Sequence, residues 1–105
     1  FDEFSALDLR TGTIIAAEKI KKTKKLLHLK VDLGFEIRTI VSGIAESYSP
    51  EEMIGKKVTV LANLESRTIK GVESQGMLLM TENKEGKLIV IGPEDENMGN
   101  GFEIN

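Results

Sequence analysis

The sequence of 105 residues contains no cysteine and no tryptophan, and it has a single histidine. The absence of cysteine excludes disulfides, thiolate zinc sites and cysteine nucleophiles, and it agrees with a reducing cytoplasm. No apolar run approaches the roughly 20 residues that a helix needs to cross a bilayer, so we expect no membrane span. These absences predict a cytoplasmic domain. Its length of 105 residues is enough for one compact core.

Groups that carry catalysis are equally scarce. The one histidine, His28, lies in a stretch where apolar and polar residues alternate, and we expect it to face solvent from a strand. Asp8, Asp32 and the other carboxylates show no metal-ligand spacing, and the glycines form neither a phosphate-binding loop nor a dinucleotide-binding fingerprint. The sequence therefore predicts a binding domain without catalysis, metal or cofactor.

Charge is unevenly distributed along the chain, although the net charge is only −3. Residues 9–38 contain eight Lys and Arg against three Asp and Glu, a net charge of +5. Residues 82–105 contain two Lys against six Asp and Glu, a net charge of −4. A folded domain can thus present one basic face on an acidic body. The alternative is that the lysines form a solvated loop that serves only solubility.

Alternation of apolar and polar residues predicts most of the strands. The clearest is 27–33, and the short link at 34–35 predicts that it forms a hairpin with 36–41. A longer first strand is expected over 7–17, where Gly12 lets the chain bend. Further strands are expected at the β-prone segments that remain, which are 57–62, 77–82 and 88–91.

One short helix is predicted between the third and fourth strands. Ser49 is expected to be the N-cap, Pro50 the first helical residue, Glu52 the partner in a capping box, and Gly55 the end. Three strands, a short helix and further strands are the element order of an OB fold. We therefore predict an all-β protein with a short helix, a five-stranded Greek-key OB-fold barrel with a C-terminal extension, as a single domain over residues 1–105.

The segment 63–80, NLESRTIKGVESQGMLLM, is similar to the signature of the tRNA-binding domain family. This family occurs at the C-terminus of methionyl-tRNA synthetases, in free-standing tRNA-binding proteins and in the EMAP-like cofactors of synthetase complexes. The segments LLHLKVDLG at 26–34, IVSGIA at 40–45 and YSPEEMIGKK at 48–57 match the family in order and spacing. Because the chain begins with Phe1 instead of Met, we expect a domain of a larger protein.

The resemblance implies an OB fold that binds tRNA by its overall shape. It also implies that the domain raises the tRNA affinity of a methionyl-tRNA synthetase, either in cis or in trans. The composition suits a structured RNA better than an unstacked single strand, since none of the five aromatic residues falls mid-strand. The alternative is a protein-binding module, chaperone-like or for complex assembly, because relatives of this fold include such proteins.

The predicted tRNA contacts fall into two groups. Lysines in the link between the first two strands can reach phosphates without reading bases. The resemblance implies that Ser74 and Met77 lie at the tRNA-binding surface. The alternatives are that Met77 packs in the core and that Asn63 only caps a turn. Glu65 and Thr68 replace basic residues of the family pattern. The full set of candidates is Lys21, Lys22, Lys24, Lys25, Lys30, Arg38, Asn63, Arg67, Lys70, Ser74 and Met77.

The C-terminal residues 88–105 are predicted to contribute to a homodimer. The strand at 88–91 is apolar on both faces, and Met98, Phe102 and Ile104 follow it, which is more apolar surface than so small a barrel can bury. The family resemblance also implies symmetric dimers, which would present two basic loops to one tRNA. The alternative is that this tail folds back over the end of the barrel and covers it in a monomer.

Overall fold

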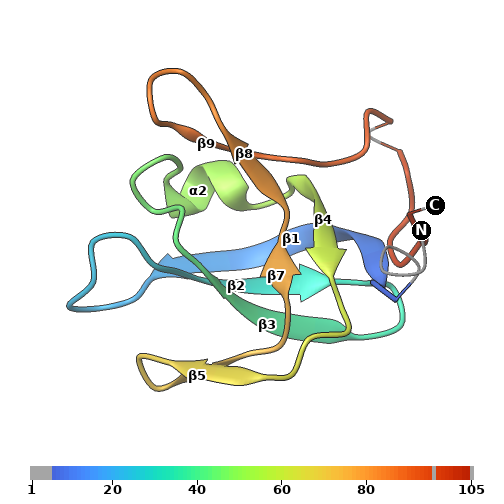
Figure 1. Ribbon diagram of the computed structural model, residues 1–105, viewed down its shortest axis with the longest axis horizontal. Helices are drawn as coiled ribbons and strands as arrows, with labels where there is room; N and C mark the ends of the chain where they lie inside the picture. Colours follow the sequence, from blue (N-terminus) through green and yellow to red (C-terminus); the bar gives the residue numbers. More distant parts are fainter. Residues whose placement is uncertain (1–5, 96, 105) are drawn as a thin grey trace.

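Five antiparallel strands form the barrel of this computed structural model, which describes residues 6–95 and 97–104. Phe1 and Phe4 lie outside the described residues. Two further hairpins extend from the barrel, β5 with β6 and β8 with β9 (Figure 1). In sheet order, the barrel strands are β3 (Ile37–Ser42), β2 (Leu27–Asp32), β1 (Leu9–Lys19), β4 (Lys57–Leu61) and β7 (Met77–Leu78). The hairpin strands are β5 (Arg67–Ile69), β6 (Val72–Ser74), β8 (Met80–Glu82) and β9 (Leu88–Val90).

The barrel nearly closes between β3 and the residues just before β7. The backbone N–H of Gln75 donates to the carbonyl of Thr39 (2.8 Å), and the N–H of Thr39 donates to Gln75 Oε1 (3.1 Å). The N–H of Val41 donates to Ser74 Oγ (3.0 Å). These bonds take the place of a strand ladder between the two ends of the sheet. The architecture confirms the predicted OB-like barrel, while the Greek-key description stays a prediction.

The core consists of the apolar residues that the alternation assigned to one face of each strand. Leu27, Leu29 and Val31 of β2 are fully buried, and they pack with Ile14, Ile40, Ile44, Met53, Val58, Val60 and Leu78. Gly12 is needed for this packing, because a Cβ atom there would lie 2.8 Å from Val31 Cγ1. The irregularity of β1 falls slightly later, between Ile14 and Ala16.

The short helix α2 (Pro50–Met53) lies between β3 and β4, as predicted. Ser49 Oγ accepts from the N–H of Glu52 (3.2 Å), and Glu52 Oε1 accepts from the N–H of Ser49 (2.9 Å), which completes the capping box. The bond from the Ser49 backbone holds the pKa of Glu52 below its usual range. Within the described residues, no helix has the length and apolar character that a membrane span requires.

Two segments differ from the prediction. The strand expected over 77–82 is two strands, because β7 pairs with β4 and β8 pairs with β9. Leu79 lies between them, where its N–H donates to Thr59 (3.0 Å) and its carbonyl accepts from Ile91 (3.1 Å). The β5–β6 hairpin was not predicted at all. It turns at Lys70 (φ 50°) and Gly71 (φ 80°), a left-handed pair that suits a tight two-residue connection.

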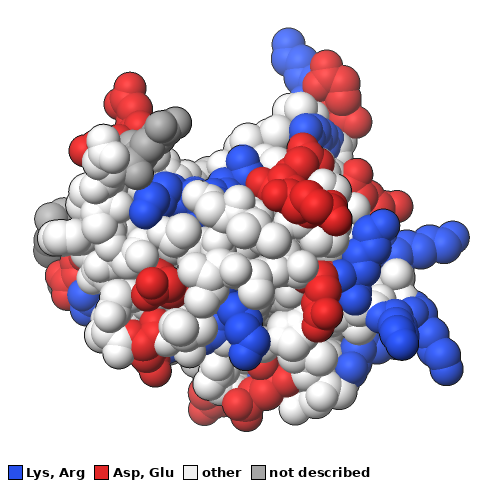
Figure 2. All heavy atoms as spheres, turned by 180° about the vertical axis from the view of Figure 1, so that it is seen from behind, with Lys and Arg blue, Asp and Glu red and all other residues white. Residues whose placement is uncertain are grey.

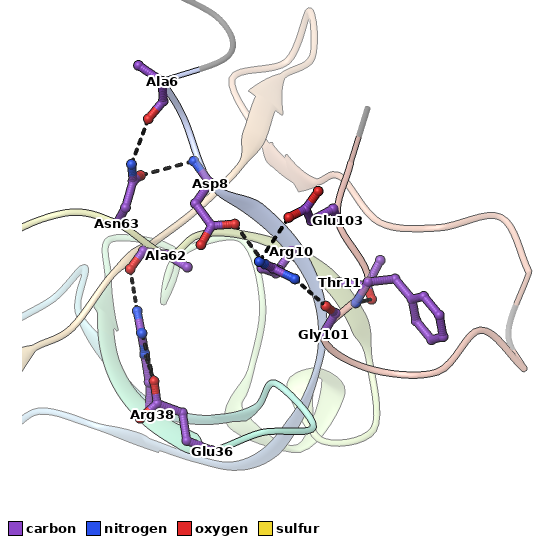
Figure 3. A network of polar contacts seen from close by, with 11 residues as sticks. Ala6, Asp8, Arg10, Thr11, Glu36, Arg38, Ala62, Asn63, Gly101 and Glu103 are labelled. Carbon is purple, nitrogen blue, oxygen red and sulfur yellow. Dashed lines mark hydrogen bonds and ion pairs between the residues drawn. The ribbon is translucent and has the colours of Figure 1, made fainter.

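The C-terminal tail folds back along the first half of β1, where β2 does not yet pair. The N–H of Thr11 donates to Phe102 (3.0 Å), the N–H of Gly101 to Thr11 (2.7 Å) and the N–H of Ile104 to Leu9 (2.9 Å). The Arg10 guanidinium holds the tail further, through the carbonyl of Gly101 (3.0 Å) and the carboxylate of Glu103 (3.1 Å) (Figure 3). This path agrees with the alternative that the tail covers the barrel, and the homodimer stays a prediction.

Candidate nucleic-acid interface

Four exposed lysines stand on the loop between β1 and β2, at positions 21, 22, 24 and 25. The loop is closed by its own backbone, since the N–H of Ile20 donates to Leu26 (3.2 Å) and the hydroxyl of Thr23 donates to Ile20 (2.7 Å). Lys22 takes a left-handed conformation with φ 66°. The loop projects from the left of the barrel in Figure 1, and Figure 2, seen from behind, shows Lys and Arg side chains gathered at the matching edge. The lysine side chains therefore face solvent together.

Lys30 lies beyond this loop on the outer face of β2 and is exposed. It lines a shallow hollow of about 200 Å³ together with His28, Glu18 and two alanines of β1. His28 is half-buried, and its Nδ1 lies 3.4 Å from Glu18 Oε1. The register pairs His28 with Val41 and Lys30 with Thr39, so this face continues directly onto β3. Lys30 is thus free to meet an anion on the face that joins the loop to β3.

A larger hollow of about 460 Å³ lies between the barrel and the β5–β6 hairpin, and we call it the hairpin hollow. It brings together three of the predicted residues from separate elements, namely Arg67 of β5, Ser74 of β6 and Met77 of β7. Met77 is 51% exposed, so it is a surface side chain and not core filler. The complete lining is Val41, Leu64, Glu65, Arg67, Ile69, Ser74, Gly76 and Met77.

Ser74 lies beneath the hairpin hollow and not on its rim. The residue is only 5% exposed, its hydroxyl oxygen accepts from the N–H of Val41 (3.0 Å), and the hydroxyl donates to the carbonyl of Gly76 (3.3 Å). The bond from Val41 ties the hairpin to β3, and the bond to Gly76 is local to the hairpin's own end. Ser74 therefore positions the wall of the hollow, and a direct bond to tRNA stays a prediction.

Arg38 and Asn63 bond to other groups of the protein with their polar side chains. Arg38 binds the carboxylate of Glu36 (2.6 Å) and donates from Nη1 to the carbonyl of Ala62 (Figure 3). Nη1 also donates to the carbonyl of Gln75 (3.3 Å). Asn63 accepts from the N–H of Asp8 (3.1 Å) and donates to the carbonyl of Ala6 (2.7 Å). This geometry gives both residues a structural role, and their predicted contact with tRNA stays a prediction.

Lys70 and Arg67 stand on the β5–β6 hairpin, which projects on the same side as the β1–β2 loop in Figure 1. Both residues are exposed. Leu64 and Ile69, which form the apolar wall of the hollow together with Met77, were missed from the sequence. The signature segment could have indicated this wall, because its apolar residues Leu64 and Ile69 lie on either side of Arg67.

The described residues contain no cluster of three or more acidic or histidine side chains that could hold a metal ion. The groups available at this surface are ammonium and guanidinium ions, the carboxylates of Glu18 and Glu65, and an apolar wall. Ammonium and guanidinium groups bind phosphates, and apolar walls pack against flat rings. This combination suits a nucleic acid.

A family model described as "Putative tRNA binding domain" matches residues 9–101. The chain belongs to this tRNA-binding domain family. The domain is 60% identical, over all 105 residues, to a methionine–tRNA ligase of Flavobacterium psychrophilum, and it spans 15% of that relative's length. The match confirms the predicted family and the prediction of a binding domain rather than a catalytic one.

Two solved structures are closely similar to this tRNA-binding domain. One is a MetRS-related protein from Pyrococcus horikoshii, with a TM-score of 0.90, 46% identity, and coverage of 98% of this chain and 94% of the other. The other is the chaperone CsaA from Bacillus anthracis, with a TM-score of 0.89, 26% identity, and coverage of 100% and 96%. Both are similar over nearly their whole length, so the fold occurs in chains of this size.

Proposed function

We propose that this domain recognises the shape and phosphate backbone of tRNA and thereby raises the tRNA affinity of a methionyl-tRNA synthetase. The synthetase is attached to the domain or associates with it in the cytoplasm. The observation that carries the proposal is the placement of four exposed lysines on the side of the barrel where the hairpin with Arg67 and Lys70 projects. The identity of 60% to a methionine–tRNA ligase supports the choice of enzyme.

The lysine loop supplies affinity without selecting a tRNA. Each ammonium group that neutralises a phosphate releases counterions from the RNA, and such contacts carry no base information. A weak general binder that is tethered to an enzyme adds a second contact at high effective concentration. The domain therefore lowers the rate of tRNA dissociation and leaves the chemistry of aminoacylation to the catalytic part.

Titration with unfractionated tRNA at several salt concentrations tests the binding step. We expect binding whose affinity falls steeply with salt. The second step is tested with the synthetase carrying or lacking the domain. Removal should raise the KM for tRNA and leave kcat at saturating tRNA unchanged. Equal KM values would contradict the affinity-raising role even if the isolated domain binds tRNA.

We also propose that the domain acts as a homodimer through residues 88–105. Ile91 and Phe102 support this, because they remain 44% and 53% exposed after the tail has folded back. Exposed apolar side chains of this size favour a protein contact. A two-fold pair would offer two lysine loops to one tRNA, which strengthens binding without a new kind of contact.

A protein-binding role is the second candidate. Leu64 and Met77 are 42% and 51% exposed at the hairpin hollow, and the similar chain from Bacillus anthracis is named a chaperone. In that case the hollow would hold apolar side chains of a client. Binding of apolar peptides together with indifference to tRNA at low salt would favour this role over the first.

A further inference from the structure

We propose that the hairpin hollow holds one unstacked nucleotide of the bound tRNA. The base lies against the apolar wall formed by Leu64, Ile69 and Met77, and Arg67 holds the adjacent phosphate. This inference rests on the proposed tRNA binding and names the part of the RNA that the site takes. It adds a pocket for a single nucleotide to a surface otherwise suited to phosphates.

The size of the hairpin hollow fits a single nucleotide. Its volume of about 460 Å³ falls in the roughly 300–1,000 Å³ range of small-molecule sites. A stacked helix cannot enter such a space, whereas one flipped or looped-out base can. Structured RNAs offer such bases in their loops, bulges and ends, where base faces are open to protein side chains.

The wall of the hollow offers two apolar surfaces that nothing in the described chain covers. Leu64 is 42% exposed and Met77 is 51% exposed, and both line the hollow. The methionine sulfur is polarisable and packs well on aromatic rings. This provides a stacking surface without an aromatic side chain, which the sequence lacks at this place.

Charge decides between a nucleotide and an apolar peptide. Arg67 is exposed on the lining of the hollow, Lys70 stands at the tip of the same hairpin, and the lysine loop projects on the same side. The planar guanidinium of Arg67 can bind a phosphate through two N–H groups or stack on a base. The apolar wall suits a flat ring and Arg67 suits a phosphate, and a nucleotide carries both groups.

The hollow reads base identity only weakly. The hydroxyl of Ser74 is already used by Val41 and Gly76, so the floor offers no free hydroxyl. Glu65 is the one carboxylate on the lining, and a carboxylate accepts from the amino and ring N–H groups of bases. Adenine and cytosine offer an amino group, uracil offers a ring N–H group, and guanine offers both. The site therefore accepts many tRNAs.

The first test removes the apolar wall and leaves the charges in place. Leu64→Ala and Met77→Ala should each weaken binding of unfractionated tRNA about two- to tenfold, the range expected for one contact between a sulfur and a ring. The salt dependence should stay that of the wild type, because no phosphate contact is lost. Ile54→Ala is the matched control, since Ile54 is 53% exposed and lies at the end of α2, outside the hollow.

The second test uses two short RNA duplexes that differ by one unpaired cytidine. The wild-type domain should bind the bulged duplex more tightly, and Met77→Ala should remove the difference. An unpaired uridine should give a similar gain, because the apolar wall and Arg67 do not select a base. Melting curves of all variants should show that they are folded, because the substituted positions are exposed.

The outcomes separate this inference from the proposed function. Wild-type binding of tRNA with a steep salt dependence, combined with unchanged affinity in the Leu64 and Met77 variants, would overturn the nucleotide site and leave the tRNA-binding role intact. Failure of the wild type to bind tRNA would remove both. Apolar peptides that occupy the hollow while bulged RNA does not would identify it as a peptide site and also overturn the inference.

Discussion

The polar residues near the site differ in how much of their bonding capacity the fold already uses. The side chains of Ser74, Arg38 and Asn63 already form hydrogen bonds with backbone groups of the protein. Arg67 and Lys70 are exposed on the hairpin and are available to a ligand. The first group should therefore affect stability and the second group affinity, although one family signature contains residues of both kinds.

Ser74→Ala should lower the free energy of unfolding by about 1–3 kcal/mol, because the buried N–H of Val41 loses its acceptor. Urea denaturation measures this change, and Ser66→Ala, at an exposed serine of the same segment, is the control. The sequence alone favours a loss of RNA affinity with little change in melting temperature. That result would show that the hydroxyl meets RNA after all.

Arg38→Ala should also lower the free energy of unfolding by about 1–3 kcal/mol, since the carbonyls of Ala62 and Gln75 lose a charged donor. Arg67→Ala should change it by less than about 0.5 kcal/mol and should weaken tRNA binding. Chemical denaturation and tRNA titration of the two variants form a matched pair. Equal stability of both variants would contradict the structural role of Arg38.

At the scale of elements, the sequence predicted the regular helix and strand patterns but not the long-range contacts. The strict alternation of 27–33 predicted β2, and the capping box of Ser49 and Glu52 predicted α2. The β5–β6 hairpin was missed because its strands have three residues each and contain only one buried residue, so no apolar period marks them. The path of the tail depends on Arg10 meeting Gly101, 91 residues away, which no local pattern can show.

The candidate site likewise has one part that the sequence predicted and one part that it did not. The lysine loop was predictable because charge clusters are visible in the sequence and loops lie on the surface. The hairpin hollow was not, because Val41, Leu64 and Met77 meet only through the tertiary fold. Whether a serine or arginine side chain is free or already bonded is likewise a property of the fold.

The lysine loop should act as an electrostatic unit. Replacing Lys21, Lys22, Lys24 and Lys25 together by alanine should weaken binding to all tRNAs alike and flatten the salt dependence, because the lost contacts are to phosphates. The fold should be retained, since all four side chains are exposed. For a matched comparison, Lys24→Ala should weaken binding more than Lys84→Ala, an exposed lysine outside the loop. Unchanged affinity of the fourfold variant at low salt would assign the loop to solubility.

The turn of the hairpin should matter for binding as a conformational unit. Gly71 has φ 80°, and alanine in this region costs about 1–2 kcal/mol in backbone strain. Because the hairpin forms one wall of the hollow, Gly71→Ala should weaken tRNA binding. Gly43→Ala is the control, since a Cβ atom there meets nothing within 4 Å and no left-handed conformation is involved. Equal tRNA affinity of the two variants would show that the hairpin does not need this turn.

At the scale of the whole molecule, the tail and the apolar strand β9 act together. The tail is held along β1 by backbone bonds and by Arg10, and Leu88, Ile89 and Val90 are half-buried. Part of the apolar surface of residues 88–104 is thus covered within one chain. Ile91 and Phe102 stay exposed, so folding back reduces the apolar surface without removing it.

The remaining apolar surface predicts that two copies associate and that the pair is needed for full tRNA affinity. Sedimentation equilibrium should show a mass that rises with concentration from one chain to two. Phe102→Ala and Ile91→Ala should shift this equilibrium toward the monomer and weaken tRNA binding in parallel, whereas Ile54→Ala should change neither, although Ile54 is equally exposed. A single species with the mass of one chain at all concentrations, binding tRNA at full strength, would contradict both the dimer and its contribution to affinity.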